Sequence, residues 1–185
     1  MADSNITKKA LASALKELME TMPFAKISVG DICERCEMNR KSFYYHFKDK
    51  EDLANWIFDG QFLEYAMQTT DENALEKLEK LVFYFYNNRS FYRKLLKHEG
   101  QNSFAEHFSE IIHPVLVNRL QAIVGANKSI AFYVNFFSGG IVCALKRWLT
   151  DPNCESPETF ISEIESCVYL LSKHNLEKFE SKKES

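Results

Sequence analysis

Residues 27–53 read ISVGDICERCEMNRKSFYYHFKDKEDL and contain the start signals of three helices. The first signal is Ser28 with Asp31 three residues later, an acidic variant of the capping box. The second is Asn39, a favoured N-cap residue, and the third is Asp49. Because only a few residues separate the first two helices, we expect a helix-turn-helix followed by a third helix.

The second of these helices carries side chains suited to a polyanion. Its first turn holds Arg40 and Lys41, where free backbone N–H groups and the positive end of the helix dipole already favour negative charge. Side chains at such a position reach base edges or phosphates in a DNA major groove. The alternative is an ordinary helical hairpin whose charges are solvated. In both cases Phe43 and Phe47 are four residues apart and are expected in the core.

This region resembles the N-terminal helix-turn-helix domain of the TetR family of bacterial transcriptional regulators. The resemblance covers the first 55 residues and rests on Ile32, Cys33, Cys36, the run FYYHF at 43–47, Lys50 and Leu53. The family usually has Gly at the turn position where this chain has Glu37, and Glu incurs a steric cost at positive φ. Residues 38–49 are similar to a subgroup that includes activators of dihydroxyacetone kinase operons.

The resemblance implies a regulator that binds double-stranded DNA and is not an enzyme. Arg40 and Lys41 are expected to read base edges from the first turn, together with Tyr44. By resemblance, other positions touch the phosphate backbone: Ser42, Tyr45, His46 and Lys50. A homodimer with two such helices is expected on an inverted-repeat operator. A small-molecule effector or a partner protein would control it through the C-terminal part.

Composition favours an all-α protein. The 185 residues include six Gly and four Pro, 45% are hydrophobic, and turn-rich alternating segments are lacking. Neither a signal peptide nor an apolar run long enough to span a membrane is evident, so we expect a cytoplasmic protein. The expected organisation is a three-helix head at 1–50, a helical-bundle body at 51–176 that dimerises, and a polar tail at 177–185.

The net charge of −3 is unusual for a DNA-binding protein, so its distribution matters. Residues 1–55 hold nine basic and nine acidic residues, which is a balance of zero. Within residues 38–50, however, four basic residues are accompanied by one acidic residue. This local excess of positive charge would attract phosphate groups that lie within about 8 Å of the segment.

The expected body contains a dense aromatic region, with six rings between residues 83 and 92. Rings at helical spacing usually pack in a core, but such density also suits a ligand pocket between helices. The candidate pocket residues are Tyr84, Tyr86, Phe91, Tyr92, Phe104, Phe108, Tyr133, Phe136 and Phe137. A pocket of this kind would hold an effector, whose polar groups would satisfy buried tyrosine hydroxyls. Under the alternative function, a helical-bundle enzyme or ligand-binding protein, it would hold a substrate or ligand.

Two later segments, 129–150 and 156–173, carry more apolar residues than a helix with one solvated face needs. A second copy of the same two helices would cover the surplus in a four-helix dimer interface. The candidate interface residues are Ile141, Leu145, Trp148, Ile164, Val168 and Leu171.

We predict no catalytic, metal or cofactor site. Cys33 and Cys36 form a C-x-x-C, but the other cysteines are too widely spread to supply the second pair of a zinc site. Glu110 and His113 form one E-x-x-H, whereas a carboxylate-bridged di-iron centre needs two. Reduced thiols that fill space in a small helical domain explain the cysteines more simply.

Overall fold

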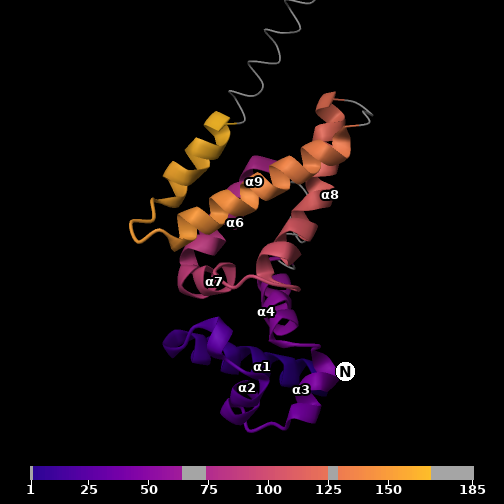
Figure 1. The fold of residues 1–185 in the computed structure, drawn as a ribbon, viewed down its shortest axis with the longest axis vertical. Coiled ribbons are helices and arrows are strands. Elements are labelled where there is room, and N and C mark those ends of the chain that lie inside the picture. The colour runs from indigo at the N-terminus through magenta and orange to yellow at the C-terminus, as the bar shows by residue number, and fades with distance from the viewer. Residues whose placement is uncertain (1, 64–73, 125–128, 168–185) are drawn as a thin grey trace, which may run out of the picture.

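The computed structural model describes residues 2–63, 74–124 and 129–167 (Figure 1). Within these ranges the chain forms helices joined by short connections and contains no strand, which confirms the all-α prediction. The predicted tail, at 177–185, lies outside the described residues, as does the last part of the expected body.

The head contains four helical elements: α1 (Ala2–Thr21), the 3₁₀ helix η1 (Phe24–Lys26), α2 (Val29–Arg35) and α3 (Arg40–His46). Their apolar faces meet in one core, in which Leu11, Leu15, Ile32 and Phe43 are fully buried. Figure 1 shows α2 and α3 at the end of the head that faces away from the rest of the molecule. The predicted helix-turn-helix is therefore confirmed, with α3 as its second helix.

The predicted start signals act as helix caps. The Ser28 hydroxyl accepts a hydrogen bond from the Asp31 N–H at 3.2 Å, and the Asp31 carboxylate accepts one from the Ser28 N–H at 2.8 Å. The Asn39 side chain accepts a hydrogen bond from the N–H at the third position of α3 at 2.8 Å. Asp49 caps the next helix in the same way, at 2.7 Å. Helix boundaries in the head are thus fixed by neighbouring residues.

The turn between α2 and α3 passes through Glu37, which has a φ of 56°. The N–H of Met38 then donates to the carbonyl of Cys33 at 2.8 Å and closes the end of α2. The turn therefore keeps the left-handed backbone that Gly adopts without strain, although Glu occupies the position.

The body begins with α4 (Lys50–Phe58), which runs from the head into the π-helical segment η2 (Asp59–Leu63). It continues with α6 (Ala74–Asn87), α7 (Arg89–Leu96), α8 (Phe104–Val124), α9 (Ile130–Thr150) and a helix over 157–167. In Figure 1 α8 and α9 lie against each other, and the helix over 157–167 runs beside α9. The helix α4 connects this body to the head.

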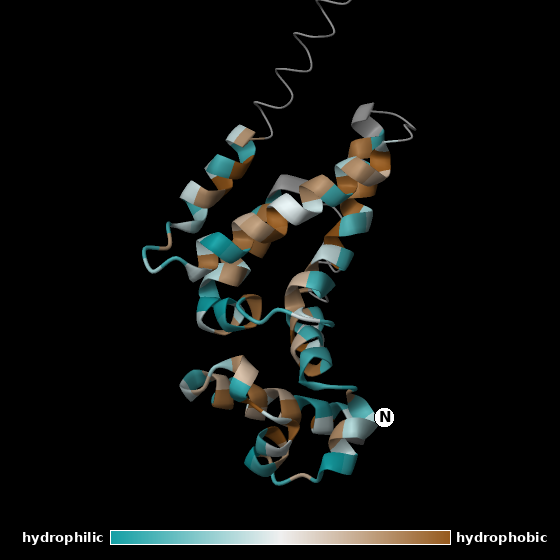
Figure 2. Cartoon of the chain, viewed as in Figure 1, coloured by the Kyte–Doolittle hydropathy of each residue, from teal (hydrophilic) through white to brown (hydrophobic). Residues whose placement is uncertain are grey.

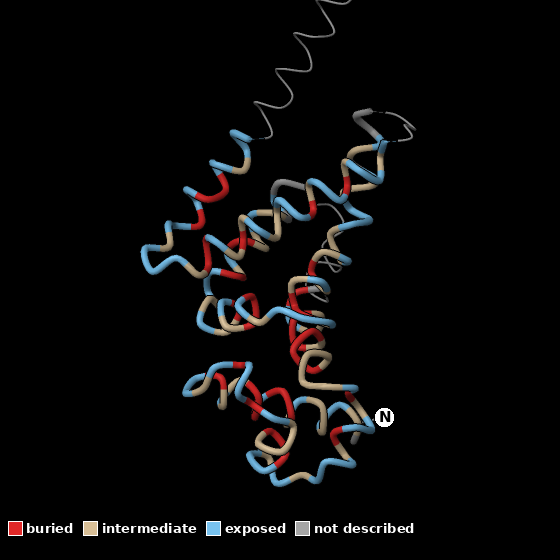
Figure 3. The backbone as a smooth tube through the Cα atoms, viewed as in Figure 1, coloured by how far each residue is buried: buried red, intermediate tan, exposed pale blue. Residues whose placement is uncertain are grey.

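Phe58 is at the centre of the body's core. Its ring lies 5.3 to 6.1 Å, between centroids, from the rings of Phe62, Tyr84, Phe85, Tyr92, Phe104 and Phe108. The hydroxyls of Tyr84 and Tyr92 are 2.6 Å apart and hydrogen-bond to each other. The rings around Phe58 thus come from η2, α6, α7 and α8, and Figure 3 shows buried stretches, in red, in both the head and the body.

The predicted aromatic pocket has to be corrected, because its residues divide between two places. Tyr92, Phe104 and Phe108 are buried in the packed core, with Tyr84 hydrogen-bonded at its edge. Phe136, by contrast, is 62% exposed on α9. Phe91 is half-buried and its ring meets that of Tyr92 at 5.2 Å between centroids, at the edge of the core. Tyr86 stacks on Trp148, and Tyr133 and Phe137 are half-buried on α9. The hydroxyls of Tyr84 and Tyr92 are partners for each other, as buried hydroxyls usually require.

The predicted dimer interface has to be corrected at Leu145 and Trp148. Both are buried within the protomer, where the Trp148 ring stacks on Phe160 with centroids 4.2 Å apart. Ile141 and Ile164 are half-buried against the same core. The remaining two candidates, Val168 and Leu171, lie outside the described residues.

One face of α9, called the open stripe below, is exposed to solvent in the protomer. Phe132, Phe136 and Cys143 are exposed along it, as are Gly139 and Gly140. Hydrophobic residues occupy much of α9 in Figure 2, consistent with a helix that is apolar on more than the side facing its own core.

Candidate nucleic-acid interface

The outer face of α3 is a row of polar and aromatic side chains. Arg40, Lys41, Tyr44 and Tyr45 are exposed, and Tyr45 is 82% exposed. On the opposite face Phe43 is fully buried, and Phe47, the residue that follows α3, is buried beside it. The i, i+4 pair thus anchors the helix and leaves its first turn in solvent. An exposed helix N-terminus of this kind favours negatively charged ligands.

Arg40 lies against the start of α2. A Cβ atom placed on Gly30 would be 2.6 Å from an Arg40 guanidinium nitrogen, so the guanidinium packs over the bare Gly30 backbone. The nearby Asp31 carboxylate has its pKa lowered, first by hydrogen bonds from Ser28 and to a smaller extent by the Arg40 charge. Gly30 therefore helps to position Arg40, a role that sequence reasoning missed because it depends on contact between two helices.

Lys50 was predicted to bind phosphate, but the structure gives it a different role. Its ammonium group donates to the carbonyls of Phe24, Ala25 and Ile27 at 2.9, 3.3 and 2.8 Å. The nitrogen also lies 4.7 Å from the centroid of the Phe24 ring. An ammonium group has three donors, and all three have partners here. Lys50 therefore ties the start of α4 to η1 instead of extending into solvent.

The other predicted phosphate-contact residues stay at the surface of α3. The Ser42 hydroxyl donates its one hydrogen to the Asn39 side chain at 3.2 Å, so it would have to turn away from Asn39 to donate to a phosphate oxygen. The rings of Tyr45 and His46 meet edge to face at 4.9 Å between centroids, which orients both. The structure thus brings Ser42, Tyr45 and His46 together with the three predicted base-reading residues on one short helix.

The cysteines of the C-x-x-C are packing residues. Burial raises the pKa of the Cys33 and Cys36 thiols, so they are less prone to form thiolate. The Cys36 thiol donates to the carbonyl of Ile32 at 3.2 Å. Among the described residues, no group of three His, Cys, Asp or Glu side chains is arranged to hold a metal ion. In the same part of the chain no helix is long and apolar enough to cross a membrane.

Comparison with known protein families shows to which family this architecture belongs. Residues 11–56 match the family of bacterial regulatory proteins named after TetR, and residues 72–169 match a transcriptional regulator C-terminal region of the TetR type. The chain belongs to the TetR family. It is a DNA-binding transcriptional regulator, and regulators of this family bind DNA and act as dimers.

Two regulators are similar in sequence. The dhaKLM operon transcriptional activator DhaS of Lactococcus lactis is 35% identical over 96 residues, which are 51% of this chain and 51% of DhaS. The match thus spans about half of that relative's length. The transcriptional regulator QacR of Staphylococcus aureus is 26% identical over 137 residues, or 74% of this chain and 72% of QacR.

Solved structures show the same fold. A TetR transcriptional regulator from Streptococcus agalactiae has a TM-score of 0.71 at 22% identity, covering 90% of this chain and 96% of that one. A structure of the dihydroxyacetone kinase operon activator DhaS has a TM-score of 0.63 at 24% identity, with coverages of 91% and 97%. The head, the connecting α4 and the helical body are therefore arranged as in other regulators of this fold.

Proposed function

We propose that the chain binds an inverted-repeat operator as a homodimer, with α3 of each protomer in a major groove. The observation that carries this proposal is the division of α3 into a buried aromatic anchor and an exposed first turn with Arg40 and Lys41. A two-fold dimer of such heads would contact half-sites about 34–36 Å apart, or a multiple of that distance. A protein that binds an operator has to be where the DNA is, so we expect this protein in the cytoplasm.

Within this interface we assign base reading to Arg40, Lys41 and Tyr44. Arginine and lysine at the first turn of a recognition helix reach guanine acceptors, and Arg does so with two parallel hydrogen bonds. Ser42, Tyr45 and His46 then contact the phosphate backbone, which sets the register of α3 but carries no sequence information. Lys50 is left out of this set because its three donors are already used.

We assign the dimer interface to the open stripe of α9. Phe132 and Phe136 are one turn apart and exposed, so they are suited to pack on the same stripe of a second copy. Apart from the neighbouring backbone of α9 itself, no atom in the described part of the chain lies within 4 Å of a Cβ placed on Gly139. The bare backbone there would let a partner helix approach closely. Ile141 and Ile164, half-buried, would flank the contact.

The experiment that tests the DNA assignment is selection of sites from a random duplex library, followed by binding titrations. We expect an inverted repeat. The Arg40→Ala variant should lose about 1–3 kcal/mol on the selected site and relax specificity at one position of each half-site. Equal losses on the selected site and on random DNA would contradict base reading by Arg40. Because of the similarity to DhaS, dihydroxyacetone kinase genes are the first natural targets to test.

Gly30→Ala provides a second test that keeps the arginine. The added methyl group would meet the flexible end of Arg40 and displace it, whereas the second position of a helix tolerates alanine well. We expect unchanged or raised head stability together with altered base preference at the position that Arg40 reads. An unaltered preference would show that the contact with Gly30 does not position Arg40 on DNA.

A further inference from the structure

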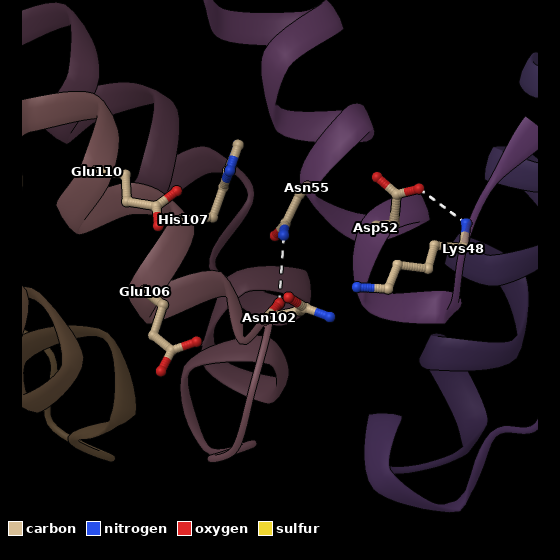
Figure 4. Close-up of a pocket in the computed structure, with 7 residues that line it drawn as sticks. All are labelled: Lys48, Asp52, Asn55, Asn102, Glu106, His107 and Glu110. Atoms are coloured by element: carbon tan, nitrogen blue, oxygen red, sulfur yellow. Dashed lines mark hydrogen bonds between the residues drawn. The ribbon is translucent and has the colours of Figure 1, made fainter.

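A polar cleft of about 230 Å³ lies where the head's connecting helix α4 meets α8 of the body (Figure 4). Seven residues line it, and none is apolar: Lys48, Asp52, Asn55, Asn102, Glu106, His107 and Glu110. Pockets for drug-sized ligands are usually larger, about 300–1,000 Å³, and mostly apolar. This cleft therefore suits a small polar ligand rather than an aromatic one.

Asn55 provides the main evidence that the cleft lacks a ligand group. The residue is 9% exposed, and its amide nitrogen donates to the Asn102 carbonyl at 3.3 Å. Its amide oxygen is buried and accepts no hydrogen bond from the described residues. A buried acceptor without a donor costs about 1–3 kcal/mol, so such an atom usually has a partner. In Figure 4 this amide points into the space between α4 and α8.

The surroundings of Asn55 indicate which kind of donor is missing. Carboxylates line the cleft from both sides, with Asp52 on α4 and with Glu106 and Glu110 one turn apart on α8. Asp52 already accepts the backbone N–H of Lys48 at 2.9 Å, and His107 is hydrogen-bonded to Asp59 at 2.8 Å. Three carboxylates with one lysine leave the cleft an excess of negative charge and of acceptors. A cationic donor is complementary to both.

We propose that this cleft binds a small organic cation of the linear alkyl diamine class. One ammonium group would donate to the Asn55 amide oxygen and Asp52, and the other to Glu106 and Glu110. A diamine fits better than a single ammonium because the acceptors stand on both walls of the cleft. It also fits better than a metal ion, because among the described residues these carboxylates do not form a group that could hold one.

Binding would hold α4, the helix that connects to the head, in one position against α8, since α4 carries one wall and α8 the other. A ligand that bridges the walls favours the relative placement of head and body in which it binds best. This second step rests on the proposed function, because the spacing of two α3 helices matters for an operator.

The first experiment needs no DNA. 1,4-Diaminobutane is titrated into the full chain by calorimetry and thermal shift, with the uncharged 1,4-butanediol as control ligand. We expect saturable binding of one diamine per protomer and a raised melting temperature. The Glu106→Gln/Glu110→Gln variant should bind at least about tenfold more weakly, because hydrogen bonds to charged groups are the strong ones.

The matched control is Glu163→Gln/Glu165→Gln, which removes the same charge from exposed positions of the helix over 157–167. It should bind the diamine as the wild type does. Equal weakening in both double variants would show that only the net charge of the protein matters, and would overturn the site. Binding that does not saturate in the wild type would overturn it as well. Equal binding of 1,4-butanediol would overturn the assignment to a cation.

The second experiment measures operator affinity with and without 1,4-diaminobutane. A diamine also binds DNA, so the Glu106→Gln/Glu110→Gln variant serves as the reference. A several-fold change in the wild type beyond that of this variant supports coupling, and equal changes overturn it. Should the chain fail to bind any DNA, the proposed function falls while the calorimetric result still decides the site.

Discussion

The head and the body bury their aromatic residues by different rules. In the head, Phe43 is buried and Tyr44, its neighbour on α3, is exposed, as the periodicity of one short helix predicts. In the body, Phe85 is 1% exposed and Phe136 is 62% exposed, although both lie in helices with many apolar residues. Local spacing thus decides burial in the head, whereas in the body the decision depends on which helix packs where.

The reason is the number of apolar faces per helix. The helix α3 has one, so the pair Phe43 and Phe47 defines the inside without further information. The helix α9 has two, and the protomer covers the one that includes Leu145 and Trp148. An amphipathic helix has one choice of inside, but a helix that is apolar nearly all round does not.

The largest effect should come from the body's aromatic core. Phe85→Ala removes a ring that stacks on Phe58 at 5.6 Å and meets Tyr92 at 4.9 Å. We expect a loss of about 3–5 kcal/mol in the free energy of unfolding, measured by denaturant titration, because a buried cavity remains. The same change at the exposed Phe132 should alter the protomer's free energy of unfolding by no more than about 0.5 kcal/mol. Similar losses at both sites would contradict the division between core and open stripe.

The open stripe of α9 is tested by a charge. Phe136→Glu should leave the protomer folded but raise the dimer dissociation constant about 30-fold or more, since interface hot spots contribute at least 2 kcal/mol. Sedimentation velocity at several concentrations measures this. Phe83→Glu, at another partly exposed phenylalanine on α6, should leave the dimer intact. A dimer that survives Phe136→Glu would place the interface elsewhere.

Much of the head could be predicted from sequence because its determinants are local. The caps at Ser28, Asn39 and Asp49 act on residues three positions away, and each is present in the structure. The exposure of Arg40 and Lys41 followed from the same helix register. The family assignment followed from this region as well, because its motif residues are close together in the chain.

The remaining features depend on contacts between distant residues. Lys50 bonds to carbonyls 23 to 26 residues earlier in the chain, so the family resemblance, which implies a phosphate contact, could not show these bonds. The spacing of the aromatic residues near Tyr84 is compatible with both a core and a pocket, because it cannot show that Phe58 fills the space between them. The cleft around Asn55 combines residues from two segments about 50 positions apart, and no sequence pattern links them.

Lys50 and Lys41 offer a direct comparison of a structural and a surface lysine in the head. Lys50→Met should lower the free energy of unfolding by about 1–3 kcal/mol, because the carbonyls at the end of η1 lose a charged donor. Lys41→Met should leave stability within about 0.5 kcal/mol but weaken binding to the selected site by about 1–3 kcal/mol, because Lys41 is assigned to base reading. Denaturant titration and binding at several salt concentrations separate the two. A changed salt slope with unchanged stability in Lys50→Met would restore Lys50 as a phosphate contact.

The smallest effect should come from the turn between α2 and α3, and its sign is the informative part. Glu37 has a φ of 56°, where a residue with a Cβ is about 1–2 kcal/mol less stable than glycine. Glycine also gives the unfolded chain more freedom, which offsets about 0.4–1 kcal/mol of the gain. Glu37→Gly should therefore raise the free energy of unfolding by up to about 1.6 kcal/mol in a denaturant titration. Glu34→Gly, the same change three residues earlier within α2, should lower it by about 1 kcal/mol. Opposite signs would show that backbone conformation governs the response, whereas destabilisation by both variants would mean that the Glu37 side chain itself stabilises the turn.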